Sequence, residues 1–174
     1  MQRIEISLHE TTLGSLLIGS LGQKICLVDF AQRDKKNVVM SRVVKGLDAE
    51  VVSQENDSIC RAKQQIDEYL QGSRTVFTFP IIMVGTLFQK EVWRALMKVP
   101  YGHTASYRDV AKSIGRPRAV RAVGTANGAN ALALVIPCHR IIAASGSLGG
   151  YGAGLAVKKR LLALEEAACN AATL

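Results

Sequence analysis

The chain has 174 residues, 48% of them hydrophobic, and carries a formal net charge of +8. This length allows one sizeable domain or two small ones, and the apolar share is ample for a packed core. No stretch approaches the roughly 20 uninterrupted apolar residues of a membrane span, and residues 1–5 lack the layout of a signal peptide. We therefore expect a cytoplasmic globular protein without a membrane partner.

The first half of the chain is predicted to form a mixed α/β domain. Alternating apolar residues at 4–8 and in parts of 15–30 predict a short antiparallel meander, with a turn at 19–22. Residues 31–56 are polar and mixed, with a loop expected at 33–36. A helix is predicted from Asp57 to a stop at Gly72, followed by an extended segment at 76–80. We place the N-terminal domain at residues 1–82 and the C-terminal domain at residues 83–174.

The second half is predicted to be mainly helical. Capping-box patterns at 86–89 and 106–109 mark two helix starts, and Arg116-Pro117 is expected to begin a third helix, since proline suits the first helical position. Two short helices around a glycine-containing turn, the second rich in arginine, are typical of a helix-turn-helix. An ordinary helical hairpin with a basic face would give the same pattern. A last helix is predicted from Leu155 to Ala168, with a frayed tail after it.

The net positive charge of the chain comes entirely from its second half. Residues 1–87 contain 10 Lys and Arg against 10 Asp and Glu, whereas residues 88–174 contain 12 against 4. A basic half beside a neutral one indicates a polyanionic partner, most commonly nucleic acid. A basic surface that only aids solubility would give the same counts, so charge leaves both interpretations open.

The cysteines indicate free thiols. Four are scattered along the chain without a CxxC pair, at Cys26, Cys60, Cys138 and Cys169. This spacing favours a reducing cytoplasm over a disulfide framework or a zinc site. Because His9 and His103 are also isolated, we expect no bound metal and no cofactor.

The most informative stretch is Pro137-Cys138-His139-Arg140. The apolar run at residues 131–136 is expected to form a buried strand that holds the thiol at the end of a rigid element. The neighbouring imidazole and guanidinium can lower the pKa of the thiol and so supply a nucleophilic thiolate near neutrality. A structural cysteine beside a surface histidine is the alternative for such a pair taken alone.

Together these features resemble the O6-alkylguanine-DNA alkyltransferases, also called methylated-DNA–protein-cysteine methyltransferases. The resemblance is close over residues 86–166 and is carried by residues 88–93, 101–102, 106–107, 115–124, Asn130, 136–140 and 155–158. Residues 1–80 share only the family's α/β outline. The implied fold is a ribonuclease-H-like N-terminal domain, with a small β-sheet plus helix, and a C-terminal domain with a winged-helix-like helix-turn-helix.

The resemblance implies a monomeric DNA repair protein that flips O6-alkylguanine out of double-stranded DNA. The alkyl group passes irreversibly to Cys138 in a single turnover, and O4-alkylthymine stays open as a second substrate. The alternative within the fold is a non-catalytic protein that binds alkylated lesions, a class that lacks the acceptor cysteine. A cysteine hydrolase or a helix-turn-helix regulator is the remaining alternative; a thioether resists hydrolysis, and a regulator has no need of Cys138.

Five catalytic residues follow from the resemblance. Cys138 matches the alkyl acceptor, His139 the base that acts on it through a water, and Glu165 the acid that orients the histidine. Tyr107 matches the tyrosine whose hydroxyl faces guanine N3, although it could also be a packed helix-start aromatic. Asn130 matches the asparagine that braces the active-site turn; here Ala131 follows it where relatives commonly carry proline, which loosens the local backbone.

The substrate pocket is also implied by the resemblance. Main-chain carbonyls at Cys138 and Ile141 match the acceptors for the guanine amine, and the N–H of Gly152 matches the donor to O6. Tyr151 precedes it in the pocket wall. Ala153 stands where some bacterial relatives carry tryptophan, so we expect the pocket to accept alkyl groups larger than methyl.

The DNA contacts implied are those of a recognition helix in the minor groove. Arg121 matches the arginine that fills the place of the flipped base, and Ala119 the small residue that allows close approach. Arg116 and Arg118 are expected to contact the DNA backbone, because lesions occur in any sequence and binding is sequence-tolerant.

Overall fold

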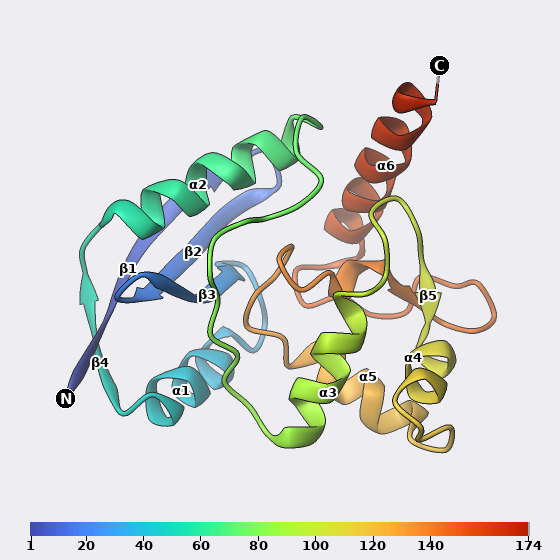
Figure 1. The fold of residues 1–174 in the computed structure, drawn as a ribbon, viewed down its shortest axis with the longest axis horizontal. Coiled ribbons are helices and arrows are strands. Elements are labelled where there is room, and N and C mark those ends of the chain that lie inside the picture. Colours follow the sequence, from blue (N-terminus) through green and yellow to red (C-terminus); the bar gives the residue numbers. More distant parts are fainter. Residues whose placement is uncertain (174) are drawn as a thin grey trace. The chain divides into compact units, whose positions relative to one another are not determined.

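The computed structural model describes residues 1–173, and its internal contacts divide the chain into two units (Figure 1). The first comprises Met1–Gly85 and the short segment Ala131–Ala133, and the second comprises Thr86–Asn130 and the chain from Leu134 onward. The first unit is a small sheet with helices and the second is mainly helical, so the predicted fold class is confirmed. Within residues 1–173, no helix has both the length and the apolar character that a membrane span needs.

The N-terminal unit contains a four-stranded sheet. Its strands are β1 (Gln2–Thr11), β2 (Gly14–Leu21), β3 (Lys24–Phe30) and β4 (Ala49–Ser53), in the order β3-β2-β1-β4. The first three strands form the predicted antiparallel meander, and β4 pairs parallel to β1. The second turn lies at Gly22, in the left-handed region at φ 58°, rather than across 19–22, because Gly19 is still paired with Leu27 in the ladder.

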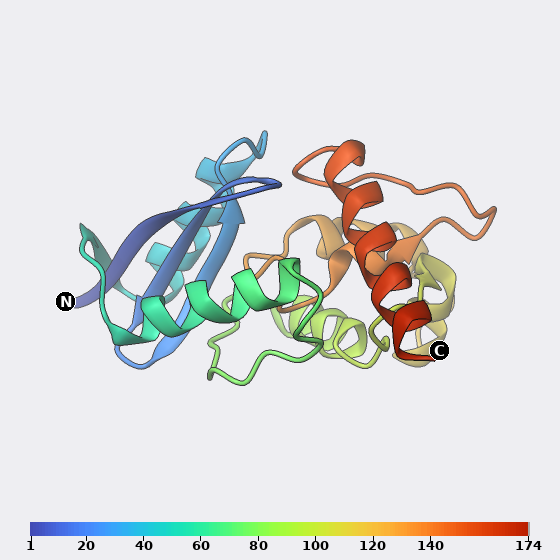
Figure 2. The same ribbon diagram turned by 90° about the horizontal axis from the view of Figure 1, so that it is seen from above.

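Helices cover both faces of this sheet, as Figure 2 shows. The even residues of β1 point to α1 (Lys36–Gly46), where Ile4 shares one buried cluster with Val39 and Val43. The odd residues point to α2 (Asp57–Leu70), where Lys63 donates a hydrogen bond to Ser7. The alternation of the strand therefore supplies an apolar face for one helix and a partly polar face for the other.

Two elements in residues 31–56 were not predicted. Helix α1 buries only Val39 and Val43, so its apolar stripe is too thin to stand out in a polar segment. Strand β4 is a five-residue edge strand, and its pairing with β1 is a non-local contact. The segment at 76–80 forms no strand, although Ile25 and Pro80 are joined by a backbone hydrogen bond of 2.9 Å.

The C-terminal unit is built on three short helices that pack together. They are α3 (Leu87–Leu96), α4 (Tyr107–Ser113) and α5 (Val120–Gly128). Both predicted capping boxes are present, with Thr86 and Gln89 at α3 and Ser106 and Asp109 at α4. The indole N–H of Trp93, a core residue, donates to the carbonyl of Ala126 at 2.9 Å and joins α3 to α5.

The third helix begins later than predicted. Residues 116–119 form a turn in which Ala119 N–H donates to the Arg116 carbonyl at 2.9 Å, and α5 begins at Val120. Pro117 therefore occupies a turn position, which its fixed φ suits as well as it suits a helix start. Arg116 and Arg118 precede the helix, and only Arg121 of the three lies within it.

The apolar run before the cysteine is not a strand, contrary to prediction. Most of its side chains are buried, but the segment makes a single bridge, Leu132 to Val28, and Leu134 turns the backbone at φ 70°. Burial alone produces an apolar run, so periodicity could not distinguish a strand from this packed turn. The segment is nevertheless held, since Val28 N–H donates to the Ala131 carbonyl at 2.8 Å.

Short elements complete this unit. Cys138–Arg140 form a single 3-10 turn, and β6 (Ile141–Ile142) pairs parallel with β5 (Ala105–Ser106). The glycine-rich segment at residues 143–154 contains no helix or strand. Helix α6 (Leu155–Ala172) extends beyond the predicted end at Ala168, because its alanine-rich last turns favour the helix.

Candidate active site

Cys138 lies at the end of a tight turn rather than at the end of a strand. Pro137 has φ −79° and ψ 63°, and Cys138 N–H donates to the Ile136 carbonyl at 2.7 Å. These values define an inverse γ-turn, which suits proline because its ring fixes φ. The side chain of Cys138 is buried, with 7% of the residue exposed. The sulfur therefore sits on a short, rigid piece of backbone.

Two asparagines fix this turn. Asn130 donates from Nδ2 to the Ile136 carbonyl at 2.8 Å, so that carbonyl accepts from both the Asn130 side chain and Cys138 N–H. Asn127 donates to the carbonyl of Cys138 at 3.5 Å. Asn130 is thus placed where a brace of the turn would be needed, and Asn127 is a second brace that the sequence did not single out.

His139 and Glu165 form a fully buried pair. His139 Nε2 lies 2.8 Å from Glu165 Oε1, and the two side chains are 0% and 1% exposed. Glu165 stands on α6, 26 residues further along the chain. The carboxylate accepts, so the proton is assigned to Nε2 and the lone pair to Nδ1.

Arg140 binds the same carboxylate. Its Nε lies 2.9 Å from Glu165 Oε2 and its Nη2 lies 2.8 Å from Oε1, while Nη1 donates to the Val99 carbonyl at 2.8 Å. Gly102 N–H adds a hydrogen bond of 3.2 Å to Oε2. A guanidinium is always charged in proteins, so the carboxylate beside it is held in the ionised form.

These surroundings keep His139 neutral. Burial lowers the pKa of His139 below its usual value of 6.5, and the positive charges of Arg140 and Lys158 lower it further. Glu165 acts in the opposite direction but does not overcome the burial. A neutral imidazole at physiological pH is the form that can accept a proton.

Tyr107 lies beside the glycine-rich segment. A Cβ at Gly149 would stand 2.8 Å from the Tyr107 hydroxyl oxygen, so only glycine allows the backbone to approach this closely. Burial raises the pKa of Tyr107, and the nearby Cys138 charge raises it further, while a hydrogen bond from the Gly150 backbone opposes both. The phenol is therefore protonated at neutral pH.

The remaining pocket residues lie around the same segment. Ile141 is buried in β6, and its carbonyl accepts a hydrogen bond from Lys158. Tyr151 and Ala153 are half-buried and Gly152 is exposed, between residue 150 and the start of α6. A carbonyl has two lone pairs, so Ile141 keeps acceptor capacity for another donor.

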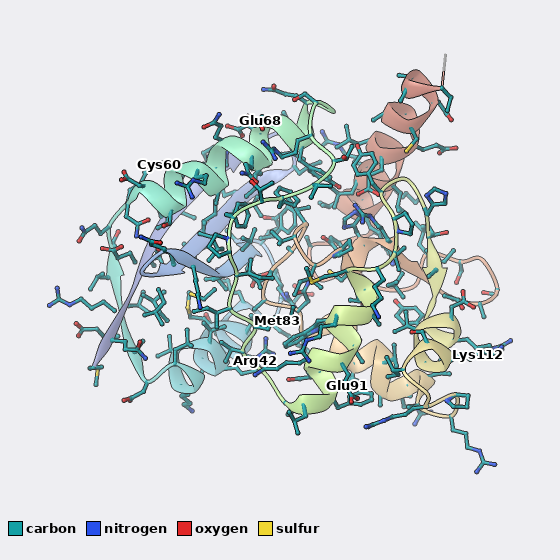
Figure 3. All side chains as sticks on the ribbon, in the orientation of Figure 1. Arg42, Cys60, Glu68, Met83, Glu91 and Lys112 are labelled. Atoms are coloured by element: carbon teal, nitrogen blue, oxygen red, sulfur yellow. The ribbon has the colours of Figure 1, made fainter. Side chains whose placement is uncertain are left out.

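The expected DNA contacts lie around α5 and the turn before it. Arg118 and Arg121 are exposed, and residues 116–119 line a surface hollow of about 510 Å³. Arg116 is already engaged: its guanidinium lies 5.3 Å from the Phe88 ring centroid and 3.2 Å from the carboxylate of Glu91, which Figure 3 labels on α3. Its contacts tie the turn to α3, so Arg118 and Arg121 are the freer cations of this surface.

Sequence reasoning missed two charged residues of the site. Arg140 was considered only as a neighbour of the thiol, whereas its guanidinium is turned to Glu165. Lys158 is 0% exposed although lysine is almost never fully buried. A signal was present, because Lys158, Leu161 and Glu165 follow the i, i+3, i+7 spacing of one helix face, and all three are buried.

The described residues offer no cluster of metal ligands. Within residues 1–173, no three His, Cys, Asp or Glu side chains gather closely enough to hold an ion.

Fold and site thus define an α/β protein with a helix-turn-helix and a buried cysteine–histidine–glutamate site, and comparison with known proteins agrees. Residues 4–82 match the family model of the ribonuclease-like domain of 6-O-methylguanine DNA methyltransferase. Residues 87–167 match that of its DNA-binding domain. The chain belongs to the methylated-DNA–protein-cysteine methyltransferase family.

Individual relatives resemble the chain over nearly its whole length. It is 39% identical over 160 residues to the methylated-DNA–protein-cysteine methyltransferase of Methanosarcina acetivorans, which covers 91% of this chain and 96% of the relative. The constitutive enzyme of Bacillus subtilis is 40% identical over 157 residues, covering 90% and 92%. The crystal structure of Mycobacterium tuberculosis OGT in complex with DNA superposes with a TM-score of 0.80 at 33% identity, covering 95% and 94%.

Proposed function

We propose that this protein repairs alkylated DNA by transferring the alkyl group from guanine O6 to Cys138. Membership of the family carries the reaction class, and the site supports the assignment to this residue. The decisive observation is that Cys138 stands next to a buried imidazole, which burial keeps neutral and Glu165 orients.

The transfer is a displacement at the alkyl carbon. The Cys138 sulfur donates an electron pair to that carbon, the carbon–O6 bond breaks, and its electron pair stays on guanine. A thioether is formed, and water does not readily release it. Each molecule therefore acts once, which distinguishes this reaction from that of a cysteine hydrolase.

His139 serves as the base for the thiol. The thiol proton passes through a water to the imidazole, whose Nδ1 lone pair is available because Nε2 donates to Glu165. The resulting imidazolium is stabilised by the carboxylate, as in other nucleophile–histidine–acid arrangements. Glu165 is thus a positioning residue for the base.

Tyr107 serves the leaving group. Guanine departs with an extra electron pair, and a phenol with a raised pKa can donate a hydrogen bond or a proton at N3. The Cys138 and Ile141 carbonyls are assigned to the guanine amine, and the N–H of Gly152 is assigned to O6. Tyr151 and Ala153 complete the wall of the pocket.

The substrate is double-stranded DNA that carries the alkylated base. A base stacked in duplex DNA cannot reach a buried sulfur, so the nucleotide has to be flipped out at a cost of a few kcal/mol. We assign Arg121 to the vacated place in the stack, Ala119 to close backbone approach and Arg118 to phosphate contact. Arg116 contributes mainly by holding the turn.

The assignments require only one chain. Every residue named for the chemistry lies in the C-terminal unit, so we propose that the protein acts as a monomer. All four cysteines are free thiols, which suits a reducing cytoplasm and, in a bacterium, the nucleoid where the DNA lies.

Intact-protein mass spectrometry tests the proposal. The protein is mixed with a duplex that contains one O6-methylguanine, and one methyl group per molecule is expected on Cys138. Cys138→Ala should gain no mass, and Cys60→Ala, which removes an exposed thiol labelled in Figure 3, should behave like the wild type. Many lesions repaired per molecule, or no mass change, would overturn it.

The flipping assignment has its own test. Arg121→Ala should slow transfer from duplex DNA, while transfer from free O6-methylguanine base should change little. Arg108→Ala is the matched control, since Arg108 is an exposed arginine on α4. Equal loss with both substrates would contradict the role of Arg121 in the DNA stack.

A further inference from the structure

Lys158 is a buried cation that the proposed chemistry does not use. It lies in the first turn of α6 and is 0% exposed. Within the described part of the chain, residues 1–173, no carboxylate lies within ion-pair distance of its ammonium group. An unpaired buried charge is costly, so a structure that retains one must satisfy it in another way.

Three backbone carbonyls satisfy this ammonium. Nζ donates to the carbonyls of Ile141 at 2.5 Å, Leu148 at 2.5 Å and Gly150 at 3.2 Å. An ammonium has three donors, so all are used. The first carbonyl belongs to β6, just after the active-site turn, and the other two belong to the glycine-rich segment at 143–154. Lys158 therefore joins β6 and the middle of this segment to α6.

The segment that Lys158 holds is the one that contacts Tyr107. Gly149 lies against the Tyr107 hydroxyl, and the backbone of the next residue, Gly150, lowers the pKa of that phenol. Five glycines between residues 146 and 154 leave this segment little side-chain packing of its own. Its position beside Tyr107 thus depends on the hydrogen bonds from Lys158 to its carbonyls.

The ammonium also lies near Cys138, because the Ile141 carbonyl that it binds belongs to the residue whose N–H donates to the Cys138 carbonyl. Burial lowers the pKa of Lys158, and the negative charge of Cys138 raises it. Tyr107, whose pKa the Cys138 charge raises, and the adjacent His139 are neutral at pH 7. Arg140 is occupied by Glu165. Lys158 is therefore the cation best placed to favour a Cys138 thiolate.

We propose that Lys158 is a positioning residue that holds the segment at 143–154 beside Tyr107 and stabilises the thiolate form of Cys138. This inference rests on the proposed function, because it assigns a use to the alkyl-acceptor thiolate. Its two parts make separate predictions. Holding the segment requires the hydrogen-bond donors of Lys158, whereas stabilising the thiolate requires its charge.

Thiol reactivity tests the charge. The rate of Cys138 carbamidomethylation by iodoacetamide is measured from pH 5 to 10 by peptide mass spectrometry, which separates Cys138 from the other three thiols. Lys158→Gln keeps a donor without charge. In this variant the midpoint, the pH at which the rate is half-maximal, should rise by about one unit, which corresponds to about tenfold less thiolate at pH 7. Lys158→Arg should keep the midpoint near that of the wild type.

Hydrogen exchange tests whether Lys158 holds the segment at 143–154. Lys158→Met removes both charge and donors, so backbone amides at 143–154 should exchange at least tenfold faster than in the wild type, with α3 unchanged. Lys159→Met is the matched control, because Lys159 is the next residue of α6 and is exposed. It should alter neither readout.

The outcomes separate this inference from the proposed function. An unchanged Cys138 midpoint in Lys158→Gln overturns the stabilisation of the thiolate by Lys158. Unchanged exchange in Lys158→Met overturns the proposal that Lys158 holds the segment. If Lys158→Met does not fold, Lys158→Ala, which also lacks donors, is used for exchange, and wild-type protection in it overturns the proposed hold on the segment. Iodoacetamide requires no DNA, so both results stand whether or not the protein accepts an alkyl group from guanine.

Discussion

His139 and Arg140 are consecutive residues, and both donate to the same oxygen of Glu165, at 2.8 Å each. Sharing one carboxylate in this way divides its charge between an imidazole and a guanidinium. The arginine neutralises the carboxylate, and the histidine is then oriented by it without being forced into the charged form. The pair of residues thus explains how a buried acid can orient a base and leave it neutral.

Removing the acid should slow the chemistry. In Glu165→Gln the imidazolium formed during transfer loses its stabilising charge, so the single-turnover rate of methyl transfer should fall roughly 100-fold. Rapid-quench assays with a methylated duplex measure this rate on folded protein. Glu166→Gln changes the exposed neighbour on α6 and should retain the wild-type rate; a similar fall in both variants would contradict the role.

Removing the arginine should destabilise the protein. Arg140→Met removes the guanidinium that balances the buried carboxylate of Glu165, and breaking a buried ion pair from one side costs about 3–5 kcal/mol. Urea denaturation measures the loss in the free energy of unfolding. Arg108→Met alters an exposed arginine and should cost well under 1 kcal/mol. Comparable stability of the two variants would rule out this account of Arg140.

Stability should depend on pH through His139. Its pKa is lowered in the folded state, so the unfolded chain binds the proton more tightly and protonation favours unfolding. The free energy of unfolding should therefore be fully retained above pH 6.5 and decline as the pH falls from there towards the lowered value. His139→Gln should flatten this decline between pH 7 and 5, whereas the exposed His103→Gln should not. The same dependence of the free energy of unfolding on pH in all three proteins would contradict this role of His139.

Gly102 should be intolerant of a side chain. Its φ is 78°, and an added Cβ would lie 2.3 Å from the sulfur of Cys169, so Gly102→Ala carries both backbone strain and a collision. Gly146→Ala has a similar φ of 90° but opens into free space, and should cost only the strain of about 1–2 kcal/mol. Thermal unfolding should rank Gly102→Ala as the less stable. Adding Cys169→Ala should recover part of the difference, and a double variant no more stable than the single one would exclude the collision.

The size of residue 153 should set the range of alkyl groups. With Ala153, O6-benzylguanine should inactivate the protein, and Ala153→Trp should reduce this inactivation by at least tenfold while methyl transfer from DNA persists. The measurement is residual methyl-transfer activity after incubation with the benzylated base. Resistance of the wild-type protein at high concentration, with methylated DNA still repaired, would show that Ala153 does not widen the pocket.

Local patterns were sufficient where the structure is set by neighbouring residues. Both capping boxes and the meander of β1 to β3 depend on contacts within a few residues or across one tight turn, and both were predicted correctly. Elements that depend on distant partners were not predicted correctly. Strand β4 pairs with a strand some 47 residues earlier, and the apolar run at 131–136 is buried by packing rather than by a ladder.

The candidate site divides along the same line. The sequence by itself determined the reactive thiol, the histidine beside it and the basic helix-turn-helix, because adjacency and composition are local properties. Only the tertiary structure decided that Arg140 turns to Glu165, that Asn130 pins the Ile136 carbonyl, and that Lys158 is buried against three carbonyls. Each of these depends on which donors and acceptors meet once water is excluded, and residue order alone does not specify that meeting.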